Sequence, residues 1–472
     1  MEKSLTSGTP WKGILSFAFP IFMGLLLQQF YNTADTIIVG NFSGEASLAA
    51  VGACGVLTMA FLALANGFSA GASVIIAQLF GAGKEEEMRR QASSSLLVML
   101  GMGVIATVAG VCISHFALKY TLATPQSLLS MADIYFKIYA LGLVFQFGYN
   151  IISAILRGIG DSKATLYFLL IASAINVVLD IVLVYGFKMG VAGAAIATDL
   201  AQIASCVAGF IYMMKKYPLF RWKIREFTFE WKLAQLTLQR GFPMALQQLI
   251  VSGGFVFIQR AVNGFGEAMT ASFSVAQKIE TYMTLPANAL MTTQATYTGQ
   301  NIGAGRIERV ITGVKHTVII SEIISILILT VVFIFAEPIV TAFGLQTEAI
   351  SYCTAHVRCV AIYLIIFASY FPLLGLFQGA DDAFYSTFVA TSALAIRVIS
   401  TYVLKEIPAI SYHMIWWNAL FGWGLGCIIT WAHFLRGKWK DKVKTKKMDD
   451  TKNQKSKIHF PYDVHMTFKL RS

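Results

Sequence analysis

Charged residues are scarce in this chain: Asp, Glu, Lys and Arg make up 13% of its 472 residues, whereas 56% are hydrophobic. Soluble domains carry about a quarter charged residues, so this composition excludes an ordinary soluble fold. Apolar stretches of about twenty residues, each long enough to cross roughly 30 Å of hydrocarbon, recur from end to end. The sequence therefore predicts an all-α polytopic membrane protein.

The chain also lacks the motifs of several other protein classes. Its six cysteines are scattered, with neither metal-ligand nor disulfide spacing. It contains no His-Glu-x-x-His, no Gly-x-Ser-x-Gly and no paired His cluster, so we expect neither an enzyme nor a bound cofactor. A Walker motif is missing as well, so ATP is not expected to supply energy. No short apolar run precedes a small-residue cleavage site, so we expect no removable signal peptide.

The net charge of +12 does not indicate a nucleic-acid partner, because Lys and Arg collect in the short connections and in the tail. Basic residues on alternate connections are typical of loops held on the cytoplasmic side of a membrane. The pattern predicts a multi-pass protein of the bacterial inner membrane with both termini in the cytoplasm. We expect a monomer in the lipid bilayer.

Twelve spanning helices fit this alternation of basic connections. In the first half of the chain they are expected at residues 14–39, 48–80, 92–114, 129–156, 165–187 and 191–214. In the second half they are expected at residues 242–262, 270–300, 310–336, 350–377, 384–404 and 410–435.

The two halves repeat one another with an offset of 222 residues. The segment from Gln78 to Lys84 (QLFGAGK) pairs with the segment from Gln300 to Arg306 (QNIGAGR), and Asn66 pairs with Asn288. Each half has an even number of crossings, so the halves share one orientation and should be related by a two-fold axis along the membrane normal. The fold class predicted is two six-helix pseudo-symmetric lobes around a central cavity.

This repeat divides the chain into four parts. Residues 1–214 form the N-terminal lobe, residues 215–240 a basic amphipathic cytoplasmic linker, residues 241–435 the C-terminal lobe, and residues 436–472 a basic tail that is expected to be disordered. Within the linker, the spacing of Phe227, Trp231 and Ala234 suits a helix in the headgroup plane, and an ordinary basic loop is the alternative.

Several segments together resemble the multidrug and toxic compound extrusion (MATE) family. They are Phe19-Pro20, the run from Tyr31 to Thr36 (YNTADT), the paired Gln-x-x-Gly-Ala-Gly segments, Leu156 to Asp161 (LRGIGD) and Gly190 to Thr198 (GVAGAAIAT). The resemblance implies secondary active efflux by alternating access, in which organic cations or amphipathic drugs leave the cell in exchange for Na⁺ or H⁺.

Four polar residues of the first half are the candidate coupling site. Asp35 lies in an otherwise uncharged run of the first expected helix. Asn176 and Asp180 share one helix face because they are four residues apart. Thr198 follows a stretch of small residues that lets helices approach closely. Two carboxylates, an amide oxygen and a hydroxyl suit Na⁺, and two neighbouring carboxylates can instead hold a proton. The resemblance implies the cation site of the N-terminal lobe at these positions.

The second half offers fewer charges for coupling. Lys278 and Glu280 are the candidate substrate residues of the C-terminal lobe, and Lys278 is a candidate for neutralising Glu280. Glu322 and Arg397 have no evident partner in the sequence. The expected seventh helix has no acid, so we predict that ion coupling resides in the N-terminal half.

Three other functions are weighed against efflux. A lipid-linked oligosaccharide flippase, from the wider superfamily that MATE proteins resemble, should have a strongly cationic cavity, whereas here intramembrane acids are at least as prominent as bases. A membrane-embedded enzyme lacks its catalytic motif, as noted above. A channel is disfavoured by the absence of a filter-like repeat.

Overall fold

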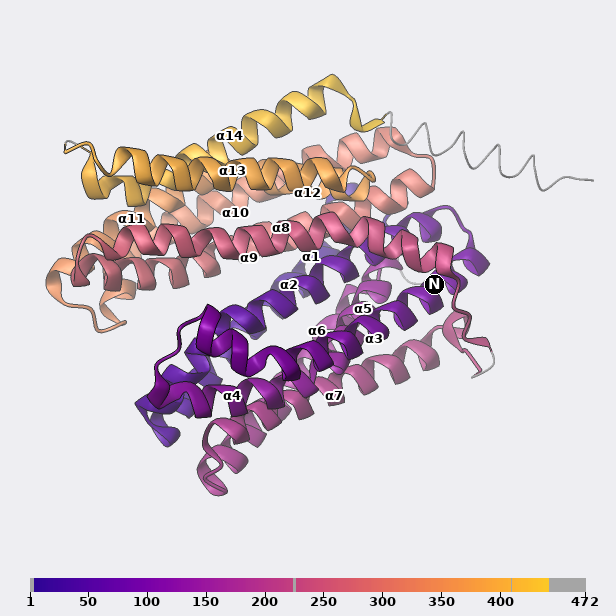
Figure 1. Cartoon of the computed structure of the whole chain (residues 1–472). Helices are drawn as coiled ribbons and strands as arrows, with labels where there is room; N and C mark the ends of the chain where they lie inside the picture. The colour runs from indigo at the N-terminus through magenta and orange to yellow at the C-terminus, as the bar shows by residue number, and fades with distance from the viewer. Residues whose placement is uncertain (1–3, 224–225, 409, 441–472) are drawn as a thin grey trace, which may run out of the picture.

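The protein is described by a computed structural model that covers residues 4–223, 226–408 and 410–440. The described residues form two lobes of seven α-helices each (Figure 1). The N-terminal lobe consists of α1 (Pro10–Ser43), α2 (Glu45–Gly81), α3 (Glu85–Phe116), α4 (Gln126–Leu141), α5 (Leu143–Gly158), α6 (Ser162–Asp180) and α7 (Gly190–Lys216). The C-terminal lobe consists of α8 (Trp231–Asn263), α9 (Glu267–Gly303), α10 (Ile307–Thr341), α11 (Thr347–Ile366), α12 (Tyr370–Gly379), α13 (Ala383–Leu404) and α14 (Met414–Arg436).

These helices confirm the predicted twelve-helix, two-lobe architecture, with two spans broken. The fourth span bends by 45° between α4 and α5. The tenth is divided into α11 and α12 by the turn at residues 367–369. By length and hydropathy, ten helices of the described chain are candidate spans, or eleven with the bent pair. The remaining crossing is α9, which has 37 residues but ends in the polar run TTQATYTGQN.

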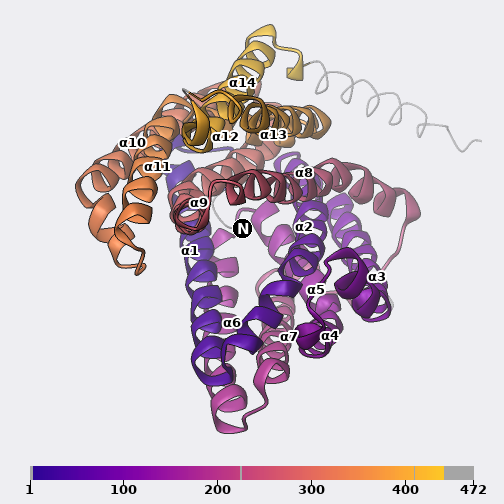
Figure 2. The same ribbon diagram turned by 60° about the vertical axis from the view of Figure 1, so that its left-hand side comes forward.

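The lobes repeat each other in their turns as well as in their helices. Gly44, between α1 and α2, and Gly266, before α9, have φ of +83° and +96°, a backbone region in which a side chain is strained. Pro20 and Pro243 occupy corresponding places inside α1 and α8. In Figure 2 the two lobes are seen as separate groups of helices, α1–α7 and α8–α14.

The linker differs from its predicted form. Helix α7 continues to Lys216, a short 3-10 turn covers Pro218–Phe220, and α8 begins only at Trp231. The predicted headgroup helix is therefore wrong for Phe227, whose ring instead packs against that of Trp222 with 5.2 Å between the ring centres. Residues 231–240, expected in the linker, are the first turns of α8. The predicted tail falls largely on residues 441–472, which lie outside the described residues.

The buried carboxylate of Asp161 stabilises the turn between α5 and α6. Burial alone would raise the pKa of Asp161, but hydrogen bonds from Tyr217, the Ala164 amide, Lys216 and Tyr212 keep it below the usual value. The Tyr217 hydroxyl donates to Asp161 Oδ2 at 2.7 Å and the Lys216 ammonium at 3.1 Å. Asp161 thus ties the end of α7 to the start of α6.

The paired Gln-x-x-Gly-Ala-Gly segments join the two lobes at one end of the bundle. Gln78 Nε2 donates to the Gly379 carbonyl at 3.0 Å, and Gln300 Nε2 donates to the Gly158 carbonyl at 2.9 Å. Each glutamine ends the long helix of one lobe and reaches the repeat-related glycine of the other. We call this the linker end of the molecule, because the N-terminal segment and the linker also lie there (Figure 1).

Glycine lets the two long helices touch at the linker end. A Cβ atom at Gly81 would overlap the Gln300 carbonyl oxygen, and one at Gly303 would overlap the Gln78 carbonyl oxygen. Both contacts join one lobe to the other, and both obey the pseudo-two-fold relation. Any larger residue at either position must separate α2 from α9.

The segments that precede α1 and α8 also cross between the lobes. Before α1, the Leu5 amide donates to Gln300 Oε1 at 3.0 Å, and Arg309 donates to the Ser7 carbonyl at 2.7 Å. Before α8, the Thr228 amide donates to Ser93 Oγ at 3.1 Å, and Arg89 pairs with Glu226 at 2.6 Å. We call these two segments, residues 4–9 and residues 226–230, the straps. They are related by the repeat, and together with Gln78 and Gln300 they close the linker end.

Gly81→Ala and Gly303→Ala are expected to shift the protein away from this closed arrangement by about tenfold or more, because overpacking a tight contact costs about 1–3 kcal/mol. The measurement is the distance between spin labels at Glu86→Cys and Glu308→Cys, in a chain whose native cysteines are replaced. We expect this distance to lengthen in both variants. Gly55→Ala on α2, where a Cβ meets nothing within 4 Å, is the control. Distances in Gly81→Ala and Gly303→Ala that equal those of the control would contradict the role of these glycines in closing the linker end.

Candidate ion and substrate sites

The four predicted coupling residues come together between three helices of the N-terminal lobe. Asp35 lies on α1, Asn176 and Asp180 on α6, and Thr198 on α7, and α6 packs against both α1 and α7. Asn176 Nδ2 donates to Thr198 Oγ1 at 3.5 Å, and Thr198 Oγ1 donates to the Ala194 carbonyl at 3.1 Å. The carboxyls of Asp35 and Asp180 are close enough to interact electrostatically.

The oxygens of this cluster are buried without enough hydrogen-bond donors. Asp35 Oδ1, Asn176 Oδ1 and both carboxylate oxygens of Asp180 are buried and have no hydrogen-bond partner among the described residues. Asp180 is fully buried and Asn176 is 2% exposed. An unpaired polar atom in an apolar medium costs several kcal/mol, and a charge costs more. A cation or a proton between these side chains would offset that cost.

Both chemistries left open by the sequence remain compatible with this donor set. Carboxylate, amide and hydroxyl oxygens are hard ligands suited to Na⁺. A proton on either carboxyl would remove one of two neighbouring like charges.

A feature that the sequence did not reveal is the π-helical segment Ile181–Gly186, which begins immediately after Asp180. Such segments widen a helix locally and are frequent at functional sites.

Asp199, next to Thr198 in sequence, belongs to a different part of the lobe. Its carboxylate occupies the space beside Gly142, where any side chain would collide with it. Gly142 is the break between α4 and α5. Asp199 thus lies against the bend of the fourth span.

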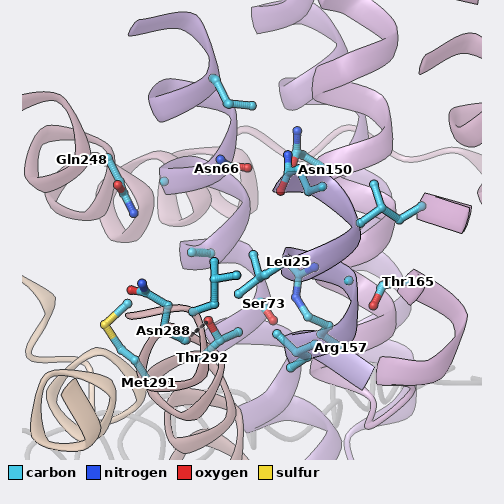
Figure 3. A pocket seen from close by; sticks show the side chains of 18 of the residues that line it. Leu25, Asn66, Ser73, Asn150, Arg157, Thr165, Gln248, Asn288, Met291 and Thr292 are labelled. Carbon is cyan, nitrogen blue, oxygen red and sulfur yellow. Dashed lines mark hydrogen bonds between the residues drawn. The ribbon is translucent and has the colours of Figure 1, made fainter. Parts of the chain in front are cut away.

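A central cavity of about 450 Å³ lies between the lobes. Amide side chains from both lobes line it, and Figure 3 shows Asn66, Asn150, Gln248 and Asn288 around it together with Arg157. Four glutamines, Gln28 and Gln29 of α1 and Gln247 and Gln248 of α8, are also among its lining residues. Arg157, in the last turn of α5, lines the cavity as well. The cavity offers many adaptable hydrogen-bonding groups to a ligand.

A second cavity of about 540 Å³ lies within the C-terminal lobe. It adjoins the central cavity, because Gln247, Gln248 and Asn288 line both. Its apolar wall carries the aromatic side chains Phe255, Tyr370, Phe371 and Trp423. Glu280 and Arg397 are the charged residues in the lining. Met59 of α2 also contributes, so both lobes border this space.

The two predicted substrate residues of this lobe have different surroundings. Glu280 is buried and lines the second cavity, whereas Lys278 is exposed on α9. The suggested neutralisation of Glu280 by Lys278 is wrong, since residues two apart on a helix face different directions. Arg397 of α13 is the partner, with Nη2 3.9 Å from Glu280 Oε1.

Arg397 is the functional candidate that the sequence analysis missed. An arginine in the middle of an apolar helix was visible, but its partner is 117 residues earlier in the chain. The helix-interior charge was the only available signal. Glu322, the other intramembrane charge without an evident partner, lies beside Cys427 and belongs to neither cavity lining.

A two-lobed bundle of membrane-crossing helices, closed at one end around polar cavities, is the architecture of a multi-pass membrane transporter. The family model named MatE matches residues 20–182 and 243–403, one stretch in each lobe. The chain therefore belongs to the MatE family, whose members are transporters and not enzymes.

Similarity to known proteins extends over almost the whole chain. The probable multidrug resistance protein YpnP of Bacillus subtilis is 28% identical over 92% of this chain and 97% of its own length. The probable multidrug resistance protein NorM of Thermotoga maritima is 24% identical over 92% of this chain and 94% of its own length. A solved structure described as the outward-facing conformation of a multidrug resistance MATE family transporter has a TM-score of 0.88 and 24% identity, covering 94% of this chain and 99% of the other.

Proposed function

We propose that this protein is a secondary active efflux antiporter that exports organic cations or amphipathic compounds in exchange for H⁺ or Na⁺. The observation that carries the proposal is the set of buried, unsatisfied oxygens on Asp35, Asn176 and Asp180. The names of the relatives, which are multidrug resistance proteins, support drug-like cargo. The two adjoining cavities supply room for it.

Exchange follows if the cation and the cargo favour different arrangements of the lobes. A ligand shifts a two-state equilibrium only by its difference in affinity for the two states. A cation that neutralises Asp35 and Asp180 changes the charge between α1 and α6, and α1 also packs against α9 of the other lobe. The ion in one lobe is thereby linked to the position of the other lobe. Opening of the linker end, which the repeat-related glutamines now close, is the required second state.

The orientation of the protein in the membrane follows from the charges at the linker end. Lys84, Arg89, Arg306 and Arg309 all lie there, beside the two straps. Basic residues are retained on the cytoplasmic side, so the linker end should face the cytoplasm.

Reporter fusions test this orientation. A periplasm-active reporter joined after Glu230 or after Lys440 is expected to be inactive, and the same reporter after Lys188, in an outer connection, is expected to be active. A cytoplasm-active reporter should give the opposite pattern. Periplasmic activity at Glu230 or Lys440 would refute both the orientation and the predicted cytoplasmic termini.

Asp35→Asn and Asp180→Asn are each expected to reduce gradient-driven transport of a fluorescent cation to background in inside-out vesicles. Asparagine preserves the shape of the side chain but cannot exchange its charge for an ion or a proton. Membrane insertion should stay within about twofold of wild type, because loss of the charge lowers an insertion cost of about 3 kcal/mol.

A partnered carboxylate of the same lobe provides the control. Asp133 accepts hydrogen bonds from Lys137 at 2.7 Å and from Ser114 at 2.6 Å, so Asp133→Asn should keep ion-driven transport. Wild-type transport rates in Asp35→Asn or Asp180→Asn would make these residues structural and refute the site. Imposing the Na⁺ gradient and the proton gradient separately on wild-type vesicles decides between the two ions.

Coupling is proposed to reside in the N-terminal lobe alone. No Asp or Glu occurs in four helices of the C-terminal lobe, α8, α12, α13 and α14. Helix α11 has one acid, Glu348, in its first turn. Glu280 is paired with Arg397, so a small cation there would compete with a fixed positive charge. Glu280→Gln is therefore expected to change the apparent affinity for cargo while transport still depends on the ion gradient. Loss of gradient dependence in Glu280→Gln, with Asp35→Asn still coupled, would reverse the roles of the two lobes.

A further inference from the structure

We propose that the central cavity contains a binding site for a small monovalent anion such as chloride, with the Arg157 guanidinium as its charged ligand. Such a site is a property of the protein itself and is independent of the proposed antiport and of the identity of the cargo. Three features point to it: the charge of the cavity lining, the unsatisfied state of Arg157, and the polar helix face that carries it.

Arg157 is the only charged residue among the described residues that line the central cavity. The other polar groups of the lining are neutral amides, hydroxyls and phenols from both lobes. Asp35 and Asp180 of the candidate coupling site are not part of this lining. The cavity therefore carries one positive charge inside a membrane-spanning bundle, where a charge has to be balanced by a partner or by a ligand.

The described residues do not balance this charge. Arg157 Nε is buried and has no hydrogen-bond partner among them, and the titratable group that interacts with the guanidinium is the neutral phenol of Tyr149. By contrast, Arg397 in the other lobe donates to Asn418 at 2.9 Å and has Glu280 as its counter-charge. Arginine stays protonated in proteins, so Arg157 cannot become neutral by losing its proton.

The helix face around Arg157 supplies further donors. Gln146, Asn150 and Arg157 are four and seven residues apart on α5, so they lie on one face, and all three line the cavity. Asn150 Nδ2 donates to the Gln146 carbonyl at 2.9 Å, and Gln146 Oε1 accepts from the Tyr139 hydroxyl at 3.1 Å. Both amides keep N–H groups that these two bonds do not use.

A hydroxyl of a second helix completes the set of donors. Ser73 of α2 lines the cavity, and Figure 3 shows it beside Arg157. The two helices are in close contact here, because a Cβ atom at Gly158 would lie 3.0 Å from the Ser73 carbonyl oxygen. A guanidinium together with neutral N–H and O–H groups is a donor set for an anion.

Charge balance selects the valence of the ligand. One guanidinium among neutral donors compensates one negative charge. A dianion such as sulfate would leave a second charge without a partner in the membrane interior, at a cost of several kcal/mol. The cavity of about 450 Å³ has room for a small ion and its remaining water.

The repeat indicates that the fold itself does not need a charge at this position. Arg157 precedes Gly158, whose carbonyl accepts from Gln300 at 2.9 Å. In the other lobe Gln378 precedes Gly379, whose carbonyl accepts from Gln78 at 3.0 Å, and Gln378 lines the same cavity. The same contact between the lobes is therefore made beside an arginine in one lobe and beside an amide in the other.

A bound anion would also change how the cavity receives a cation. With the anion present, the charge of Arg157 is cancelled, and a cation entering the cavity no longer meets a net positive charge. By linkage, the anion and the cation then raise each other's affinity. This consequence rests on the proposed function, whereas the anion site does not.

Chloride NMR of the purified full-length protein in detergent tests the site. The broadening of the free chloride line is titrated with chloride, with gluconate replacing it to keep the ionic strength constant. The wild-type protein should show a saturable component. In Arg157→Gln, which copies the residue of the other lobe, the dissociation constant of this component should rise at least about tenfold.

Two companion variants separate anion binding from folding. Arg157→Lys keeps the charge, so it should bind chloride within about threefold of wild type. Arg358→Gln is the matched control and should bind chloride as wild type does, because Arg358 Nε is likewise buried without a partner but the residue lines neither cavity. Thermal unfolding in gluconate confirms that each variant is folded.

Three results would overturn the site. They are a wild-type protein without a saturable component, equal chloride binding in wild type and Arg157→Gln, and equal loss of binding in Arg157→Gln and Arg358→Gln. Displacement of chloride by sulfate at a lower concentration than that of chloride would contradict the monovalent ligand.

Ethidium, a cation without an acidic group, tests the consequence for cations. Its dissociation constant for the wild-type protein, measured by fluorescence polarisation, should fall at least about threefold when chloride replaces gluconate. For Arg157→Gln the two salts should give the same value. A wild-type value that does not depend on chloride would refute this role of the anion, and the chloride titration decides the site itself. Gradient-driven transport in vesicles reports on the antiport separately from both binding measurements.

Discussion

The cost of a charge without a partner in hydrocarbon is the constraint on which the rest of this structure depends. Asp161 is buried but receives four hydrogen bonds, so it serves as a structural tie at the linker end. Asp180 is equally buried and has no described donor on either carboxylate oxygen. Both aspartates are buried, so it is their hydrogen-bonding surroundings that distinguish them. The first is satisfied by the fold, and the second is where the proposed ion or proton would bind.

The two lobes share a scaffold but divide the chemistry. Gln78 and Gln300 make matching contacts across the interface, and so do the glycines beside them, because the helices that carry them are repeats. Charges in the membrane do not follow the repeat. The N-terminal lobe places two acids together, and the C-terminal lobe places an acid beside an arginine. A pseudo-symmetric set of helices therefore carries an asymmetric set of buried charges.

Closure at the linker end combines contacts of two kinds. Close backbone packing at Gly81 and Gly303 determines how near α2 and α9 can lie, and the hydrogen bonds of the two straps add polar contacts that water can replace. Because the packing at the two glycines leaves no room for a side chain, the closed arrangement is well defined. Because water can replace the hydrogen bonds of the straps, the closed arrangement is reversible. Both properties are needed by a protein that must open and close at this end.

The sequence by itself determined the number of crossings, the repeat and the family, and it singled out the four polar residues that lie together between α1, α6 and α7. Long apolar runs have one stable environment, and an aspartate inside such a run, as at Asp35, is costly enough to be conspicuous. Tertiary structure alone decided the rest. Glu280 is paired with Arg397, and Lys278 is exposed instead. Arg157 lines the central cavity, and the fourth span bends at Gly142. Those features depend on which helices pack together and in which rotation, and residues more than a hundred positions apart leave no local periodicity that could reveal it.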